Sequence, residues 1–329
     1  MKIFTASNYK IVFLLIVLLL ILLPKNLFSQ DESLKYTIVV HGGAGYIDPD
    51  IEESIKESYL NSLTKALNIG KKILEEGGSS LDAVEQVIKY FEDDSLFNAG
   101  KGAVLTSEGT VELDASIMNG RDLSTGAVAG VKTIKNPISL ARLVMEKTPH
   151  VLFAGEGADK LGEQLGVEIV QQEYFRVEKR YQQWKMKMQE KIKGTVGCVA
   201  MDKSGNIAAG TSTGGLTGKM PGRVGDSPLV NAGTYANNKT CGVSGTGTGE
   251  LFIKHTIAFN VSALMEYKGM TLEQAANEVV FNFLPEGAGG IIAVDKDGNF
   301  AFPFNTPSML RGVAASSGIF EVKIWSDDQ

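Results

Sequence analysis

The segment from Lys191 to Gly215 contains a threonine whose surroundings suggest chemistry. Thr195 follows Gly194 at the point where a long charged stretch gives way to two strand-like runs of small residues. A threonine hydroxyl is a poor nucleophile at neutral pH and needs a base within hydrogen-bond reach. If the chain is cut between Gly194 and Thr195, the new α-amino group, with a reference pKa of about 8, lies beside the hydroxyl. One residue would then supply both the nucleophile and the base.

Thr195 could instead simply begin a β-hairpin, because threonine is common in strands and "TVGCVAMDKSGNIAAGTST" reads as two strands joined by a Ser-Gly-Asn turn. The three histidines, His41, His150 and His255, have no neighbours that suggest a Ser-His-Asp arrangement. Gly194 favours the cut, because it lacks a Cβ and lets the chain bend and present its carbonyl group to the Thr195 hydroxyl.

A second motif, "KMPGRVGDSP", places Arg223 and Asp226 three residues apart in a loop whose path is fixed by glycine and proline. An arginine can bind a carboxylate through two hydrogen bonds, and a neighbouring aspartate can hold an ammonium group. Together the pair matches the head group of an α-amino acid. The alternative is a surface ion pair within the loop.

A third motif, "SGTGTGE", lies between an expected strand and an expected helix. It supplies Thr246, Gly247, Thr248 and Gly249, whose backbone N–H groups and hydroxyls could form an oxyanion hole. The competing interpretation is a dinucleotide-binding loop. That pattern fits poorly, because its third glycine would fall at position 250, which is Glu250.

Composition limits the class of protein. The 329 residues are 43% hydrophobic, enough for one large core, and the net charge of -6 with scattered Lys and Arg predicts no nucleic-acid partner. Cys198 and Cys241 lie in apolar, strand-like runs, which favours buried thiols over a disulfide and suggests no metal site.

The N-terminus indicates export. Two lysines precede an unbroken apolar run from Ile11 to Leu23, which is short for a membrane span and suits a secretory signal. We therefore expect a signal peptide over residues 1–29, ending at Ser29, and a periplasmic or secreted protein with no stable membrane span. The alternative is an uncleaved N-terminal membrane anchor, because Leu27 is not the small residue that a cleavage site prefers.

The rest of the chain is expected to mix α and β structure without an internal repeat. Residues 175–193 are dense in Lys, Arg, Gln and Glu, which predicts an exposed helix between two halves rather than a ligand site. The other expected elements are strands over 36–40, in two pieces of "GAVLTSEGTVELDASIMNG" and in the hairpin from Thr195, and helices over about 51–76, from Ser79 to "YFEDD", over 137–146 and over 155–165.

Together these motifs resemble the isoaspartyl peptidases of the plant-type L-asparaginase family, within the N-terminal nucleophile hydrolases. The match runs in order through "HGGAG", "LFNAGKGAV", "ELDASIM", "GAVAGV", "NPISLARLVME", "GTVGCVAMDKSGNIAAGTSTGG", "PGRVGDSPLV", "YANN", "GTGTGE" and "PFNTPSM". The resemblance implies an α+β fold, a four-layer αββα sandwich made as one precursor. It also implies self-cleavage into an α subunit over 30–194, whose residues 175–194 form an exposed linker, and a β subunit over 195–329. Two copies of each subunit would form an (αβ)2 heterotetramer.

The resemblance further implies roles for single residues. Thr195 would be the nucleophile and base, with Thr213 as its hydrogen-bonding partner, and Asn98 would approach the scissile region. Thr246 and Gly247 would form the oxyanion hole. The substrate would be bound by Arg223 at its α-carboxylate, by Asp226 at its α-amino group, and by a pocket lined by Thr246, Gly247 and Gly249.

No organic cofactor is implied. The loop that leads into Asn98 resembles the sodium-binding loop of the family, and the alternatives are an anion-binding loop or a purely structural one. The backbone carbonyl groups that would bind a structural sodium ion belong to Phe91, Glu92, Asp94, Phe97, Ala99 and Lys101.

The implied activity is hydrolysis of β-aspartyl dipeptides and L-asparagine with release of L-aspartate, because a pocket that holds both α-groups leaves the side-chain carbonyl facing Thr195. Glycosylasparaginases are the nearest alternative, but they have Asp before the nucleophile, "TNG" and "GNGD", where this chain has Gly194, "TGG" and "GTGE". Alternatives from other classes are a nucleotide-binding protein and an exported amino-acid-binding protein without activity.

Overall fold

The computed structural model of the protein describes residues 35–186 and 192–326. Within these ranges no helix combines the length and the apolar character that crossing a membrane requires. The expected signal peptide over residues 1–29 and positions 187–191 of the expected linker lie outside the described residues.

The larger of two sheets carries Thr195 on a central strand. Its strands are β1 (Thr37–Gly45), β2 (Leu113–Asn119), β3 (Thr125–Val131), β4 (Leu152–Ala154), β5 (Ile192–Lys193), β6 (Thr195–Met201), β7 (Ile207–Thr213), β12 (Ser308–Ala315) and β13 (Phe320–Trp325). They follow the order β13-β12-β1-β6-β7-β2-β3-β4, and β5 pairs with β1. Neighbouring strands are antiparallel, except for the parallel pair β3 and β4.

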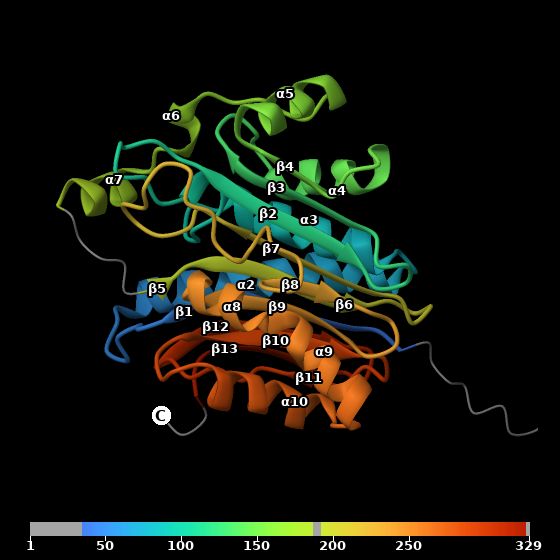
Figure 1. Ribbon diagram of the computed structural model, residues 1–329. Coiled ribbons are helices and arrows are strands. Elements are labelled where there is room, and N and C mark those ends of the chain that lie inside the picture. The colour runs from blue at the N-terminus through green and yellow to red at the C-terminus, as the bar shows by residue number, and fades with distance from the viewer. Residues whose placement is uncertain (1–34, 187–191, 327–329) are drawn as a thin grey trace, which may run out of the picture. The chain divides into compact units, whose positions relative to one another are not determined.

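The second sheet packs against one face of the first, as Figure 1 shows for β8, β9 and β10 beside β6 and β7. Its strands are β8 (Thr234–Ala236), β9 (Cys241–Gly247), β10 (Gly289–Asp295) and β11 (Phe300–Ala301), in the order β11-β10-β9-β8. The sheets approach closely because small residues face each other. A Cβ atom on Gly242 would lie 2.6 Å from Val199 Cγ1 and 2.7 Å from Ile207 Cγ2.

Helices cover the outer face of each sheet. Helices α2 (Glu53–Glu75), α3 (Ser80–Asp93) and α4 (Pro137–Lys147) pack on the large sheet, and α9 (Ile257–Lys268) and α10 (Leu272–Glu278) pack on the small one (Figure 1). One apolar core lies between α2, α3, α4 and the large sheet, and a second fills the space between the sheets and beneath α9 and α10. The αββα sandwich expected from the resemblance is therefore confirmed.

Local sequence patterns predicted most of these elements. Helix α5 (Gly155–Leu165) and α2 to α4 occupy the expected ranges, and Ser79 caps α3 by accepting the Asp82 N–H at 3.1 Å. Cys198 and Cys241 are buried free thiols, as expected.

Two expected elements differ. Only the second piece of "GAVLTSEGTVELDASIMNG" forms a strand, β2, because residues 103–106 follow a short 3-10 turn, η2 (Gly100–Gly102), and continue as a loop. The helix expected after "GTGTGE" is divided into α8 (Gly249–His255) and α9 by Thr256, whose φ of 49° interrupts the helical path. A π-helical turn, η3 (Val279–Phe283), then follows α10.

The charged stretch that precedes Thr195 is less exposed than its composition predicts. It contains α7 (Glu178–Lys185), preceded by α6 (Gln172–Phe175). Phe175 is fully buried, and Arg180 is only 8% exposed because its Nε donates to the Gly102 carbonyl at 2.9 Å. Gly194 is buried as well. The expectation of an exposed linker over 175–194 is therefore wrong at these three residues.

Candidate active site

Thr195 and Thr213 face each other across the β6–β7 pair, at the edge of the space between the two sheets. They are direct partners in the strand register, and they are 7% and 3% exposed. The Thr195 hydroxyl donates to Thr213 Oγ1 at 3.3 Å. The Thr213 hydroxyl in turn donates to the Gly194 carbonyl oxygen at 3.3 Å and accepts the Gly215 N–H at 3.0 Å. Thr213 thus contacts the expected nucleophile and the expected scissile carbonyl at once.

Asn98 lies directly behind the Gly194–Thr195 bond. A Cβ atom on Gly194 would be 2.6 Å from Asn98 Cβ, closer than real side chains pack, so the position requires glycine. The Asn98 side chain is anchored at both ends, because Nδ2 donates to the Gly215 carbonyl at 2.7 Å and Oδ1 accepts the Val104 N–H at 2.9 Å. The structure therefore places Asn98 in contact with Gly194.

Arg223 and Asp226 lie in one loop, but the intraloop ion pair considered from the sequence is replaced by a different one. Arg223 donates through Nε and Nη2 to Glu250 Oε1, at 3.0 and 2.8 Å. Asp226 is buried, and its Oδ2 accepts no hydrogen bond from the described residues. Burial raises the pKa of Asp226 to about 7, although the Arg223 charge opposes the shift. A buried carboxylate with one oxygen unpaired is suited to an incoming ammonium group.

Two glycines join this loop to the rest of the site. A Cβ atom on Gly249 would be 2.8 Å from Asp226 Oδ1 and 3.0 Å from Arg223 Nη2, so Gly249 contacts both charged side chains. A Cβ atom on Gly215 would be 3.3 Å from Arg223 Nη1, and the N–H of the same glycine donates to Thr213. Gly215 therefore lies between Arg223 and Thr213 and contacts both residues.

Thr246 and Gly247 are the last two residues of strand β9. Thr246 is fully buried, and its Oγ1 accepts the Ala44 N–H at 3.3 Å. Ala44 pairs with Lys193 of β5, directly before Gly194. The structure thus brings the expected oxyanion-hole residues to the Gly194 end of the space between the sheets.

The expected sodium loop packs tightly around two glycines. Cβ atoms on Gly100 and Gly102 would overlap the carbonyl oxygens of Glu92 and Phe97, respectively. The side chains in this loop have other partners: Glu92 accepts from the Ser212 hydroxyl at 2.7 Å, and burial raises its pKa to about 8. The other five residues of the expected loop also have partners. Phe91 and Phe97 contact each other edge to face in the core, and Lys101 lies over the Tyr174 ring. The Asp94 carboxylate accepts from the Ser62 hydroxyl, and the Ala99 carbonyl accepts the Gly102 N–H.

These carbonyl groups are the neutral oxygens that a sodium ion prefers, so the loop fits such an ion in donor type. The carbonyls of Phe91, Asp94 and Ala99 each accept one backbone N–H, at 3.2, 3.3 and 3.1 Å, and each keeps a second lone pair. Across residues 35–186 and 192–326, no group of three His, Cys, Asp or Glu side chains is placed to bind a metal ion.

The sequence did not single out His41 and Glu250, which both contact site residues. His41 forms a 3.0 Å hydrogen bond with the Thr195 carbonyl, and Glu250 binds Arg223. The "HGGAG" and "GTGTGE" motifs contained both residues, but only the fold shows their partners.

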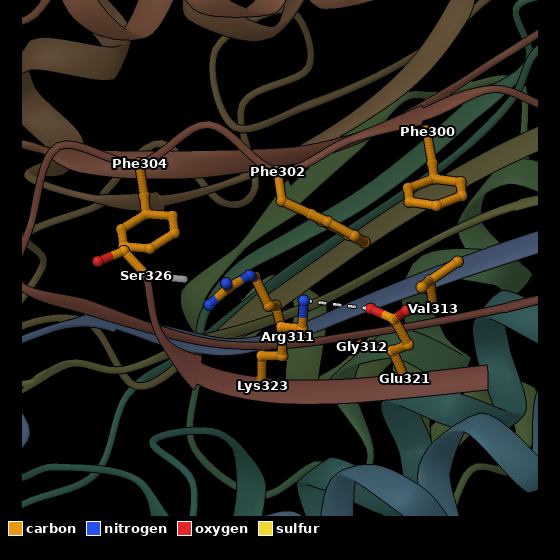
Figure 2. A pocket seen from close by; sticks show the side chains of 9 residues that line it. All are labelled: Phe300, Phe302, Phe304, Arg311, Gly312, Val313, Glu321, Lys323 and Ser326. Carbon is orange, nitrogen blue, oxygen red and sulfur yellow. Dashed lines mark ion pairs between the residues drawn. The ribbon is translucent and has the colours of Figure 1, made fainter. Parts of the chain in front are cut away.

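A separate hollow of about 400 Å³ lies at the open edge of the sandwich, between the segment that contains β11 and strands β12 and β13 (Figure 2). Phe304 covers the Arg311 guanidinium at 4.9 Å, and Lys323 pairs with Glu321 at 3.3 Å. Its lining includes none of the residues that the sequence assigned to the site: it consists of Phe300, Phe302, Phe304, Arg311, Gly312, Val313, Glu321, Lys323 and Ser326.

Comparisons with known proteins agree with this arrangement. The sequence model of the family described as asparaginase matches residues 34–324. An isoaspartyl peptidase of Escherichia coli (strain K12) is 46% identical over 314 residues, which cover 88% of this chain and 97% of that protein. A probable isoaspartyl peptidase/L-asparaginase 2 of Arabidopsis thaliana is 45% identical over 323 residues, covering 88% and 99%. An isoaspartyl peptidase/L-asparaginase of Bos taurus is 44% identical over 284 residues, covering 83% and 91%. The chain therefore belongs to the asparaginase family of N-terminal nucleophile hydrolases.

Proposed function

We propose that this protein is a self-processing amidohydrolase that cleaves β-aspartyl dipeptides and L-asparagine and releases L-aspartate. The observation that carries the proposal is the Thr195–Thr213 hydroxyl pair, which Gly215 connects to Arg223. The names of the relatives, isoaspartyl peptidase and L-asparaginase, support the same substrate class.

The contacts around Gly194 support self-cleavage. The Thr195 hydroxyl attacks the Gly194 carbonyl carbon, and the Thr213 hydroxyl, which donates to the oxygen of that carbonyl, stabilises the developing negative charge. The amide bond breaks as an ester forms on Thr195 Oγ1, and the released α-amino group takes up the proton. Water then hydrolyses the ester, which leaves a carboxylate on Gly194 and restores the Thr195 hydroxyl.

Substrate turnover uses the same hydroxyl with the newly freed amine. Arg223 binds the α-carboxylate of the substrate and the unpaired Oδ2 of Asp226 binds its α-ammonium group, so the side-chain carbonyl faces Thr195. The Thr195 amine accepts the hydroxyl proton during attack and passes it to the leaving amine. Thr246 and Gly247 stabilise the oxyanion, and water then releases aspartate from the acyl-enzyme.

Substrate discrimination tests this proposal. An α-linked Asp-Leu dipeptide has no free α-carboxylate for Arg223, and its scissile carbonyl lies one methylene away from the attack position. Because a misplacement of about 1 Å can cost about a hundredfold in rate, β-Asp-Leu should be hydrolysed far faster than α-Asp-Leu. L-Asparagine should be a substrate, and L-glutamine a poor one. Equal rates for the two Asp-Leu isomers would contradict the proposed binding of the α-groups.

Processing is tested separately by intact mass and N-terminal sequencing of the purified protein. We expect two fragments, one of which begins with "TVGCV", and we expect Thr195→Ala to remain a single chain without activity. A permanently single chain that still hydrolyses β-Asp-Leu would rule out the free-amine mechanism.

A structural sodium ion belongs to the same proposal, with the carbonyl groups of the 91–101 loop as ligands. The Phe91, Asp94 and Ala99 carbonyls support it, because each accepts one backbone N–H and keeps a second lone pair that a cation could bind. Thermal unfolding in sodium chloride and in choline chloride of equal ionic strength tests it. We expect a higher Tm in sodium chloride. Equal Tm values in the two salts would mean that the loop binds no sodium ion and has only a structural role.

The proposal also includes export and assembly. The apolar run from Ile11 to Leu23 supports a secretory signal, and N-terminal sequencing of protein from its natural source tests whether residues 1–29 are removed. The assembly expected from the resemblance is an (αβ)2 heterotetramer, which light scattering of the processed protein distinguishes from a single αβ unit.

A further inference from the structure

The Thr195 carbonyl oxygen is bound by a side chain beyond the last residue pair of β1 and β6, His41 and Gly197. Strands β1 and β6 pair regularly up to His41 and Gly197, where their pairing ends, and on its other edge β1 shifts register against β12 between His41 and Gly43. The His41 Nδ1 atom lies 3.0 Å from the Thr195 carbonyl oxygen. The imidazole therefore supplies a hydrogen bond to the nucleophile at the point where the β1–β6 ladder ends.

A row of buried hydroxyl groups continues from the other side of the imidazole. His41 Nε2 is 3.0 Å from Ser244 Oγ, and Ser244 Oγ is 2.7 Å from Thr211 Oγ1. Thr234 donates to Thr211 Oγ1 at 2.6 Å. Ser116 Oγ is 2.8 Å from Thr234 Oγ1 and donates to the Ser227 carbonyl at 2.6 Å. The row consists of His41, Ser244, Thr211, Thr234 and Ser116, all with 0% exposure, and spans both sheets through β1, β9, β7, β8 and β2.

The Thr195 carbonyl at one end of the row determines where the protons of His41, Ser244, Thr211 and Thr234 lie. The Thr195 carbonyl oxygen can only accept, so His41 must carry its proton on Nδ1. Burial lowers the pKa of His41 to about 3, so the ring is neutral and Nε2 must accept from Ser244. Ser244 has then used its single proton, so it must accept from Thr211, which accepts from Thr234. Ser116 has one proton and two acceptors, the Ser227 carbonyl oxygen at 2.6 Å and Thr234 Oγ1 at 2.8 Å, so the order of donors and acceptors is determined from Thr234 to His41.

We propose that Ser244, Thr211 and Thr234 are positioning residues, whose hydroxyls hold His41 in the tautomer that donates to the Thr195 carbonyl and so fix the nucleophile. The kinetic part of this inference rests on the proposed hydrolase activity.

Substitutions at Thr211 separate positioning from packing. Thr211→Val keeps the volume and removes the donor, so Ser244 loses the partner that fixes its proton. Since a small displacement of a reacting group costs about ten- to a hundredfold in rate, kcat should fall by that factor with KM unchanged, because Arg223 and Asp226 are untouched. Thr211→Ser restores a hydroxyl and should restore most of kcat.

Thr240→Val is the matched control. Thr240 is also a buried threonine, and its hydroxyl is 2.6 Å from Ser262 Oγ, outside the row. It should lose stability as Thr211→Val does, with kcat unchanged. If both valine variants lower kcat equally, or if Thr211→Val raises KM alone, the row has no positioning role.

Imidazole nitrogen NMR tests the tautomer without any assay of activity. The chain has three histidines; His150 and His255 are exposed, whereas His41 is fully buried and hydrogen-bonded at both ring nitrogens, which distinguishes its signals. We expect the unaltered protein to show His41 protonated on Nδ1, and Ser244→Ala to show a mixture of tautomers. A proton on Nε2 in the unaltered protein would overturn the inference even if hydrolysis is observed, whereas the expected tautomer in a protein inactive on β-Asp-Leu would overturn the proposed function alone.

Discussion

Thr195 and Thr213 are opposed on neighbouring strands, and their hydroxyl oxygens are 3.3 Å apart. Thr213 also donates to the Gly194 carbonyl and accepts the Gly215 N–H, so one hydroxyl contacts the nucleophile, the scissile bond and the link to Arg223. Because β6 and β7 form a tight antiparallel hairpin, this relationship is set by strand register rather than by a mobile loop.

The first prediction concerns Thr213. Thr213→Val should slow both self-cleavage and β-Asp-Leu hydrolysis, because the Gly194 carbonyl loses its hydroxyl donor and the Thr195 hydroxyl loses its acceptor. Removal of one donor to a developing oxyanion costs about a hundred- to a thousandfold. Gel analysis of precursor conversion and a coupled aspartate assay measure the two rates. Thr213→Ser should retain much of both, and full activity in the valine variant would remove Thr213 from the mechanism.

The second prediction concerns Gly194. Gly194→Ala should accumulate as uncut precursor, because the added Cβ would lie 2.6 Å from Asn98 Cβ and displace the scissile carbonyl. Gly157→Ala is the control, since a Cβ there meets nothing within 4 Å. Mass spectrometry of both purified variants gives the cut fraction. Normal cutting of Gly194→Ala would mean that Asn98 and its loop can move aside.

The sequence predicted the elements whose signals are local. The hairpin that begins at Thr195 and the capped start of α3 at Ser79 both depend on neighbouring residues, and both are found. The expected roles of Thr246, Gly247 and Gly249 rest on motifs that resemble a known family.

Partners far apart in the chain could not be predicted in the same way. His41 and Thr195 are 154 positions apart, and Arg223 and Glu250 are 27 apart, so no local pattern joins them. The charged stretch before Gly194 was misjudged for a related reason. Arg180 reads as a solvated charge, but a loop carbonyl from Gly102 allows the guanidinium to be buried.

The third prediction tests the arginine. Arg223→Ala should cripple β-Asp-Leu turnover and leave self-cleavage largely intact, because the precursor presents no free α-carboxylate. Truncation of one partner in a buried charged pair costs about 2 to 5 kcal/mol. Arg142→Ala is the matched control: its side chain is 17% exposed against 16% for Arg223, and it forms ion pairs on the outer helices. Equal loss of cutting and turnover in Arg223→Ala would make that residue structural.

The last prediction concerns pH. Burial raises the pKa of Asp226 to about 7, so in the free enzyme its carboxyl group is neutral below that pH and charged above it. Only the charged form attracts the ammonium group of the substrate, and the Thr195 amine, with a reference pKa of about 8, must also be unprotonated to act as base. The reaction therefore requires both groups to be deprotonated. Below pH 7 both must lose a proton, so log(kcat/KM) should rise with a slope of about two; between pH 7 and 8 only the amine must, and the slope should be about one.

Asp226→Asn separates the two ionisations, because asparagine cannot titrate. Its kcat/KM should be lower at every pH, and the slope below about pH 7 should fall from about two to about one, since only the Thr195 amine still titrates. Initial rates of β-Asp-Leu hydrolysis between about pH 5.5 and 8, each at substrate concentrations well below KM, provide the profile. Self-cleavage of the same variant serves as the control, because the precursor carries no substrate ammonium for Asp226 to bind. Identical slopes in the two proteins would show that Asp226 is already ionised in the free enzyme, and that its buried carboxylate is stabilised by a partner other than the substrate.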